Sequence, residues 1–176
     1  RGWNRAERFS LIDVDAPPHQ VRMDPNNPRK VYGVHGDALV VASEKGIRLE
    51  GPDHHGFWPF PEPVHVQYVG SDGENLWIIE LEGRLSKLAL IDGLASTVAS
   101  TDLGDVGVGL DVDARGVAVL TDRVLGPPAL LRLYDLELNL LAQHPFDASL
   151  FAPQVVLGPD QVAVGERKDW EFFQRP

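Results

Sequence analysis

The 176-residue sequence contains no cysteine. This absence excludes disulfide bridges, thiolate zinc sites and cysteine nucleophiles. Long hydrophobic runs are also missing, since none approaches the roughly 20 apolar residues that a membrane-spanning helix needs. We therefore expect a soluble protein without a transmembrane segment. The chain starts with neither a Met nor a hydrophobic signal core, which leaves open that a targeting segment has been removed and leaves the compartment unassigned.

Basic residues are scarce and scattered. Lys and Arg number 16 against 26 Asp and Glu, which gives a formal net charge of -10. The longest basic cluster is Arg29-Lys30, so no basic stripe is available for a phosphate backbone. Nucleic acid and an anionic membrane surface are therefore not expected as partners. We expect a protein or a small polar ligand instead.

Turn-forming residues are abundant by contrast. The sequence has 17 Gly and 14 Pro, spread at intervals and not gathered in one tract. Residues of this kind mark turns, and many turns imply many short strands. The composition favours an all-β protein over a helix bundle or a disordered chain.

An internal repeat gives these turns an order. Each repeat contains a short alternating strand, a turn rich in Asp, Gly, Pro or Asn, and a second strand. Equivalent apolar positions in the first strands are separated by 45, 44 and 45 residues; they are Val21, Val66, Leu110 and Val155. Further alternating segments complete each unit, so the pattern predicts four short strands per unit of about 45 residues.

Units of this kind resemble the blades of β-propellers. Leu131–Leu136 followed by Asn139–Ala142 resembles the third and fourth strands of a blade, and Asp111–Val119 resembles its first turn. The resemblance implies a single domain over residues 1–176, with about four four-stranded antiparallel blades. The approximate repeats are 20–64, 65–108, 109–151, and 152–176 combined with 1–19. The sequence has neither a WD40 nor a kelch signature, so no propeller family is assigned.

The incomplete last unit suggests how the ring closes. It has three recognisable strands, and the N-terminal segment Arg8–Val14 is an unassigned strand. We expect this strand to become the outer strand of the last blade and so to close the ring. Two alternatives remain: two chains join into a larger ring, or the chain is part of a longer propeller. If this chain does not close the ring, Trp170, Phe172 and Phe173 become an exposed contact for a homodimer.

The predicted site lies on the loops that link the outer strand of one blade to the inner strand of the next. These links are Asp15–His19, Asp53–Pro63, Thr101–Val106 and His144–Ser149. All of them contain Asp, most of the His residues fall in or beside them, and loops on a rigid scaffold often carry function. The predicted ligand- or partner-binding residues are Asp53, His54, His55, Phe57, Trp58, Phe60, Asp102, Asp105, His144 and Asp147. Trp58 is expected as the central aromatic anchor.

Three functions fit this pattern. The first is a non-catalytic binding or scaffold propeller that uses the links of one face. The second is a metal-dependent hydrolase or lyase with His and Asp at the channel mouth, in which His19, His54 and His144 hold a divalent metal. The third is a structural oligomerisation domain. No catalytic residue is assigned, because the common serine hydrolase and zinc protease motifs are absent from the sequence.

Overall fold

A computed structural model describes residues 8–11, 19–22, 31–52, 55–122, 129–146, 153–166 and 169–176. Strands, turns and bends make up these residues, and none of them is helical. Accordingly, no helix within the described ranges has the length and apolar character needed to cross a membrane. The described chain is therefore all-β, as the spacing of Gly and Pro predicts.

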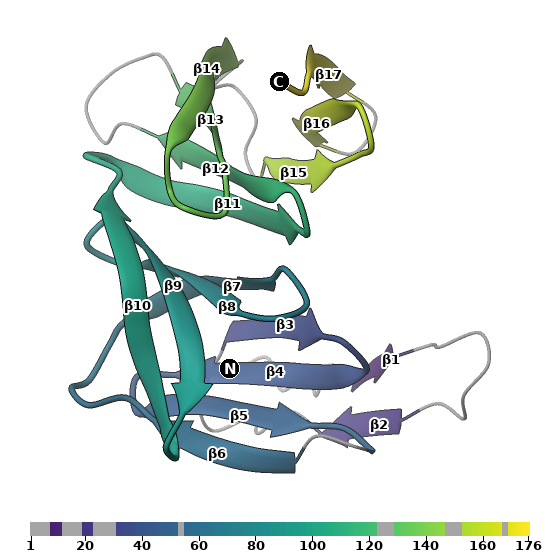
Figure 1. The fold of residues 1–176 in the computed structure, drawn as a ribbon. Helices are drawn as coiled ribbons and strands as arrows, with labels where there is room; N and C mark the ends of the chain where they lie inside the picture. The colour runs from purple at the N-terminus through teal and green to yellow at the C-terminus, as the bar shows by residue number, and fades with distance from the viewer. Residues whose placement is uncertain are drawn as a thin grey trace, which may run out of the picture.

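The strands form five antiparallel sheets, in which neighbours along the chain pair with one another (Figure 1). The first sheet contains β3 (Val31–His35), β4 (Ala38–Ser43), β5 (Gly46–Glu50) and β6 (His55–Pro59). The second sheet contains β7 (Val66–Ser71), β8 (Leu76–Glu80), β9 (Arg84–Ile91) and β10 (Leu94–Asp102). The third sheet contains β11 (Val106–Asp113), β12 (Gly116–Asp122), β13 (Ala129–Tyr134) and β14 (Leu140–Phe146). The last sheet contains β15 (Gln154–Leu157), β16 (Gln161–Glu166) and β17 (Asp169–Gln174), and the short pair is β1 (Arg8–Leu11) with β2 (His19–Arg22).

Tight turns fold the chain back between these strands. Asp92 and Gly93 join β9 to β10 with φ angles of 52° and 77°. A two-residue hairpin whose central residues both have positive φ matches the right-handed twist of its strands, and Asp-Gly is a preferred pair for it. The sequence between the hydrophobic runs thus determines where the hairpins form.

Alternating side chains on the strands create the core. On β8, Leu76 and Ile78 pack toward the first sheet, whereas Trp77 and Ile79 pack toward the third sheet. All four side chains are almost completely buried. Because successive residues of a strand point to opposite faces, a middle sheet must be apolar on both faces. The near-continuous hydrophobic sequence Leu76–Ile79 meets that requirement.

The first strands of the sheets approach one another closely. β3 contacts β7, β7 contacts β11, and β11 contacts β15. A Cβ atom on Gly70 in β7 would lie 2.8 Å from a methyl carbon of Val112 in β11. The hydroxyl of Tyr68 also donates a hydrogen bond of 2.8 Å to the backbone oxygen of Val108. Each sheet therefore packs on the next in chain order, with its first strand nearest its neighbour.

The prediction of an all-β protein built from about four antiparallel sheets is confirmed. The predicted closure by the N-terminal strand is wrong for the described residues, because β1 pairs with β2 and the last sheet has three strands. Residues 19–22 supply β1 with an alternating partner only a short connection away. A short connection costs less loop-closure entropy than pairing across the whole chain.

Outer strands extend further than the sequence indicated. Residues 55–59 form β6, and residues 144–146 belong to β14, although both were predicted to lie in links. The equivalent of the other first strands is β3, which begins at Val31, and not the segment near Val21. Pro59 and Pro145 suggested loops, but β6 and β14 are edge strands, where a proline need not donate to a neighbour.

Candidate functional site

The aromatic residues of the predicted Asp53–Pro63 link separate to opposite faces of β6. Trp58 is partly buried and packs on the core between the first two sheets. Phe60 belongs to the same core and is only 8% exposed. Phe57 points to the other face and is 48% exposed, and His55 at the start of the strand is also exposed. These residues therefore do not form one continuous aromatic surface.

Asp105 is engaged in an ion pair within the protein. Its Oδ2 lies 3.0 Å from Nη2 of Arg132 on β13, and the two side chains are 12% and 13% exposed. Arg132 also donates a hydrogen bond to the backbone oxygen of Leu103. Asp102 is exposed, and its Oδ1 accepts the backbone N–H of Gly104 at 2.8 Å. Both acids thus shape the connection between the second and third sheets.

The predicted metal ligands are only partly described. His144 lies on β14, and its ring stacks on Phe173 with centroids 5.2 Å apart. His19 lies on β2, where its side chain is not described; His54, Asp53 and Asp147 lie outside the described residues. Within the described part of the chain, no group of three or more His, Asp or Glu residues is arranged to hold a metal ion. The divalent-metal site therefore stays a prediction.

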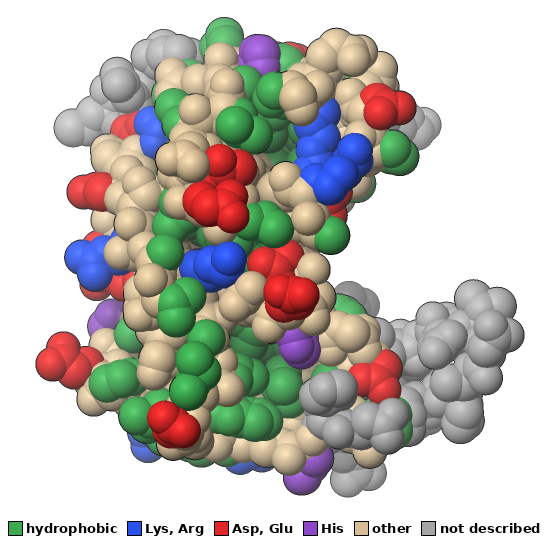
Figure 2. All heavy atoms as spheres, in the orientation of Figure 1, with side chains coloured by type: hydrophobic (Ala, Val, Ile, Leu, Met, Phe, Trp, Pro, Cys, Tyr) green, Lys and Arg blue, Asp and Glu red, His purple; other side chains and the backbone are tan. Residues whose placement is uncertain are grey.

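A cavity of about 360 Å³ opens between the first and second sheets. We call it the Trp58 cavity. Its volume lies within the range of about 300–1,000 Å³ that is usual for small-molecule sites. Most of its wall is apolar, with one imidazole and one carboxylate; the lining residues are His35, Leu49, Trp58, Glu74, Leu76, Leu88, Ala89, Leu90 and Ile91. Figure 2 shows hydrophobic side chains gathered in a hollow in front of β4 and β5 and beside the end of β9, with His and acidic side chains at its edge.

Gly56 makes room for the indole of Trp58. A Cβ atom at residue 56 would lie only 2.5 Å from the far edge of the Trp58 ring. Residues 56 and 58 point to the same face of β6, so the indole lies back over Gly56. This orientation brings the ring against the cavity. A glycine two residues before the tryptophan is thus part of the site.

Two polar groups are positioned at the cavity by the turn between β7 and β8. His35 Nδ1 lies 2.6 Å from Ser71 Oγ, and that oxygen also accepts the N–H of Gly73 at 3.0 Å. Asp72 Oδ1 accepts the backbone N–H of Glu74 at 2.8 Å and holds this residue in the turn. The hydrogen bonds order the side of the cavity that carries the imidazole and the carboxylate.

Asp72 itself is committed to the turn. Burial disfavours its charged form, but hydrogen bonds from Asn75, Trp77 and Glu74 outweigh this effect and hold the carboxyl pKa below its ordinary value. The indole N–H of Trp77 donates one of these bonds at 3.0 Å. The carboxylate is therefore charged at neutral pH, and it links the turn to the buried core.

Comparisons with protein families and with curated protein sequences find no match. Solved structures do match. The computationally designed Ika4 protein aligns with a TM-score of 0.60 at 10% identity, over 82% of this chain and 89% of the design. The designed Ika8 protein aligns with the same TM-score and identity, over 89% of this chain and 47% of the design. BamB from Moraxella catarrhalis aligns with a TM-score of 0.59 at 11% identity, over 81% of this chain and 45% of BamB.

The chain has the β-propeller fold. At these identities the similarity shows the fold alone, and the chain spans about half the length of Ika8 and BamB. The four sheets from β3 to β17 are its blades. The Trp58 cavity lies between the first two blades, at the ends of β3, β5 and β9.

One wall of this cavity was predicted from the sequence. Trp58 was predicted as a binding residue, but His35 and Glu74 were not. The links between blades, where the binding site was predicted, lie at the opposite strand ends from the cavity. An acidic turn directly before the buried run Leu76–Ile79 was the one available signal for Glu74.

Proposed function

We propose that this chain is a non-catalytic binding module of the β-propeller class, and that its ligand site is the Trp58 cavity. The supporting observation is the cavity itself: about 360 Å³, largely apolar, with one indole, one imidazole and one carboxylate. Few polar groups in an apolar hollow are typical of sites that bury a small molecule and orient it. A propeller holds such a site rigidly between two packed blades.

Binding of small aromatic probes tests this proposal. Intrinsic tryptophan fluorescence excited at 295 nm should change on titration with phenyl compounds, because Trp58 lines the cavity. Leu90→Trp should abolish binding, because residue 90 lines the cavity, is partly buried, and would fill part of the cavity with a larger side chain. Leu140→Trp on the distant β14, where the side chain is 52% exposed, is the matched control. Equal affinity in both variants would contradict the proposal.

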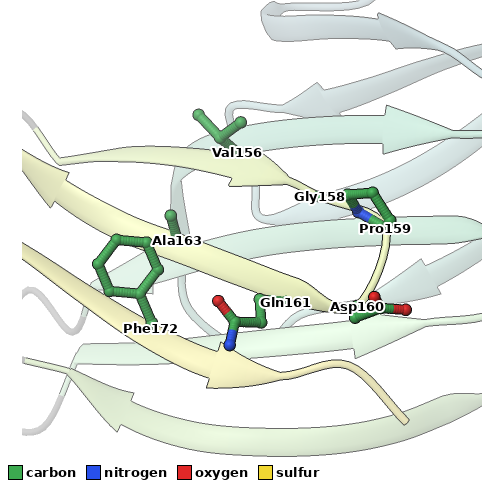
Figure 3. A pocket seen from close by; sticks show the side chains of 7 residues that line it. All are labelled: Val156, Gly158, Pro159, Asp160, Gln161, Ala163 and Phe172. Atoms are coloured by element: carbon green, nitrogen blue, oxygen red, sulfur yellow. The ribbon is translucent and has the colours of Figure 1, made fainter.

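A second candidate function is self-association through the last blade. Val156 and Phe172 on its outer face are 48% and 66% exposed. Figure 3 shows these side chains with Ala163 on the same face, and they line a hollow of about 340 Å³. Asp160 in the turn between β15 and β16 also lines it, whereas the strand residues that line it, which include Gln161, carry no charge. A second copy of this chain is the favoured occupant, because strand residues without charge can meet their own copies with little of the repulsion expected from a net charge of -10.

Light scattering coupled to size exclusion tests this candidate. Wild-type protein should show a mass that rises with concentration toward two chains. Phe172→Glu should remain a monomer at the same concentration, because like charges would then face each other. Phe57→Glu introduces the same charge at another exposed aromatic residue and serves as the control. A strictly monomeric wild type at high concentration would exclude this candidate.

A further inference from the structure

We infer that the ligand of the Trp58 cavity is a small organic cation: an apolar, preferably aromatic body that carries a protonated amine. This inference rests on the proposed binding function and adds the chemical class of the ligand. It follows from three features of the cavity, which are the apolar side chains of its wall, the sign of the charge around its mouth, and the presence of an indole beside a carboxylate.

The wall requires an apolar body. Leu49, Leu76 and Leu88 are 2%, 1% and 0% exposed and form its deepest part. No side chain in this part can hydrogen-bond to a polar group, and burial of an unpaired polar group is costly. The portion of the ligand that enters here must therefore be hydrocarbon. Ile91 is 52% exposed and marks the transition from this interior to solvent.

The mouth favours positive charge. Three turns close this side of the first two blades, and they carry Asp37, Glu74 and Asp92. Among the described residues of these turns, and of the short Gly51-Pro52 segment beside them, there is no Lys or Arg. Among the described residues of these turns, an anion would meet carboxylates of its own sign, whereas an amine at the end of an apolar body would lie near Glu74. This is charge complementarity with a cation.

The interface between the second and third blades already contains a cation, an indole and a carboxylate in contact. The ammonium of Lys87 lies 5.2 Å from the ring centroid of Trp77, and the Trp77 indole donates to Asp72. A cation over the face of an indole is attracted by the ring quadrupole. In the Trp58 cavity the indole and a carboxylate line the wall together with the imidazole of His35, but no Lys or Arg side chain does. A ligand amine would supply the missing cation.

Three probes with one hydrocarbon body test the inference. They are 4-phenylbutylamine, 4-phenylbutanol and 4-phenylbutyrate, which share a phenyl ring on a chain of four carbons and end in an ammonium, a hydroxyl and a carboxylate group. Affinity is measured by tryptophan fluorescence in low-salt buffer at pH 7. We expect the amine to bind roughly two- to fivefold more tightly than the alcohol, since a partly exposed charge pair contributes about that factor. The acid should bind more weakly than the alcohol, and salt should reduce these differences.

Two charge variants locate the source of selectivity. Glu74→Gln should lower the affinity for the amine toward that for the alcohol and leave the affinity for the alcohol unchanged. Glu62→Gln removes the same charge from an exposed residue on the link between β6 and β7, at the other strand ends, and should change neither affinity. Thermal unfolding confirms that both variants are folded.

The outcomes separate the ligand class from the binding function. Selectivity for the amine that depends on Glu74 and is lost in Leu90→Trp supports both. If the three probes bind equally and Leu90→Trp abolishes their binding, the inference that the ligand is a cation is overturned, and the proposed binding site stands. Preference for the acid also overturns the cation. Absence of binding for all three probes, or binding unaffected by Leu90→Trp, overturns both the ligand class and the proposed function.

Discussion

Replacement of Asp105 by Asn should destabilise the protein substantially. The carboxylate lies 3.0 Å from the Arg132 guanidinium, and both side chains are about seven-eighths buried. Removal of one partner from a buried ion pair typically costs about 3–5 kcal/mol, whereas an exposed pair contributes about 0–1 kcal/mol. Arg132 keeps its bond to the backbone of Leu103. We therefore expect the free energy of unfolding to fall by about 2–3 kcal/mol.

Urea unfolding at pH 7, followed by tryptophan fluorescence, measures this change. The midpoint should fall with little change in the m-value, because the surface exposed on unfolding stays the same. Arg132→Met and the double variant complete a cycle, and the double variant should lose less than the sum of the two single losses. Asp102→Asn is the matched control, since Asp102 is exposed. If Asp105→Asn costs no more than Asp102→Asn, the structural role assigned to Asp105 is refuted.

Three further changes test other contacts. Arg175→Met removes charge-assisted bonds of 2.5 and 2.6 Å to Asp113 and should cost about 1–3 kcal/mol at pH 7 by urea unfolding. Hydrogen bonding from Arg175 is the main cause that lowers the folded-state pKa of Asp113. The stability that these bonds contribute is therefore present above the unfolded-state pKa of Asp113 and disappears as pH falls through its folded-state pKa. A difference in unfolding free energy between wild type and Arg175→Met that is unchanged at about pH 2 would contradict this assignment. Trp77→Phe removes a donor to Asp72 and should raise its carboxyl pKa in an NMR titration; an unchanged pKa would count against the bond. Gly70→Ala should lower the melting temperature, because its Cβ would clash with the next blade; an unchanged value would be inconsistent with the close approach of the first strands.

The repeated strands and turns were predictable because they depend on local chemistry. Alternation around Trp77 and turn residues such as Asp92-Gly93 are properties of a few neighbouring residues, and they recur at a period that the sequence displays. Their recurrence was enough to predict an all-β propeller.

The ends of strands and the pairing of the N-terminus were not predictable in this way. Pro59 and Pro145 resemble loop residues in sequence, and their tolerance in edge strands depends on which neighbours the strands acquire. The partner of β1 likewise depends on a competition between distant segments. Local patterns do not resolve such a competition.

The binding site was half predictable. An aromatic residue between prolines attracted attention to Trp58, but the cavity needs contributions from both blades. Glu74 is 16 residues further along the chain and reaches the same cavity only because the first two blades pack face to face. Conversely, Asp105 was predicted as a binding residue because it lies in a link between blades, but its carboxylate forms an ion pair with Arg132 within the protein. Only the packing of blades distinguishes the two acids.

An experimental structure of the protein crystallised with 4-phenylbutylamine tests the central claim most directly. We expect electron density for the phenyl ring between Trp58 and Leu88, with the amine directed toward Glu74. A ligand bound elsewhere would contradict it. So would first and second blades that pack with no space between Trp58 and the leucine wall.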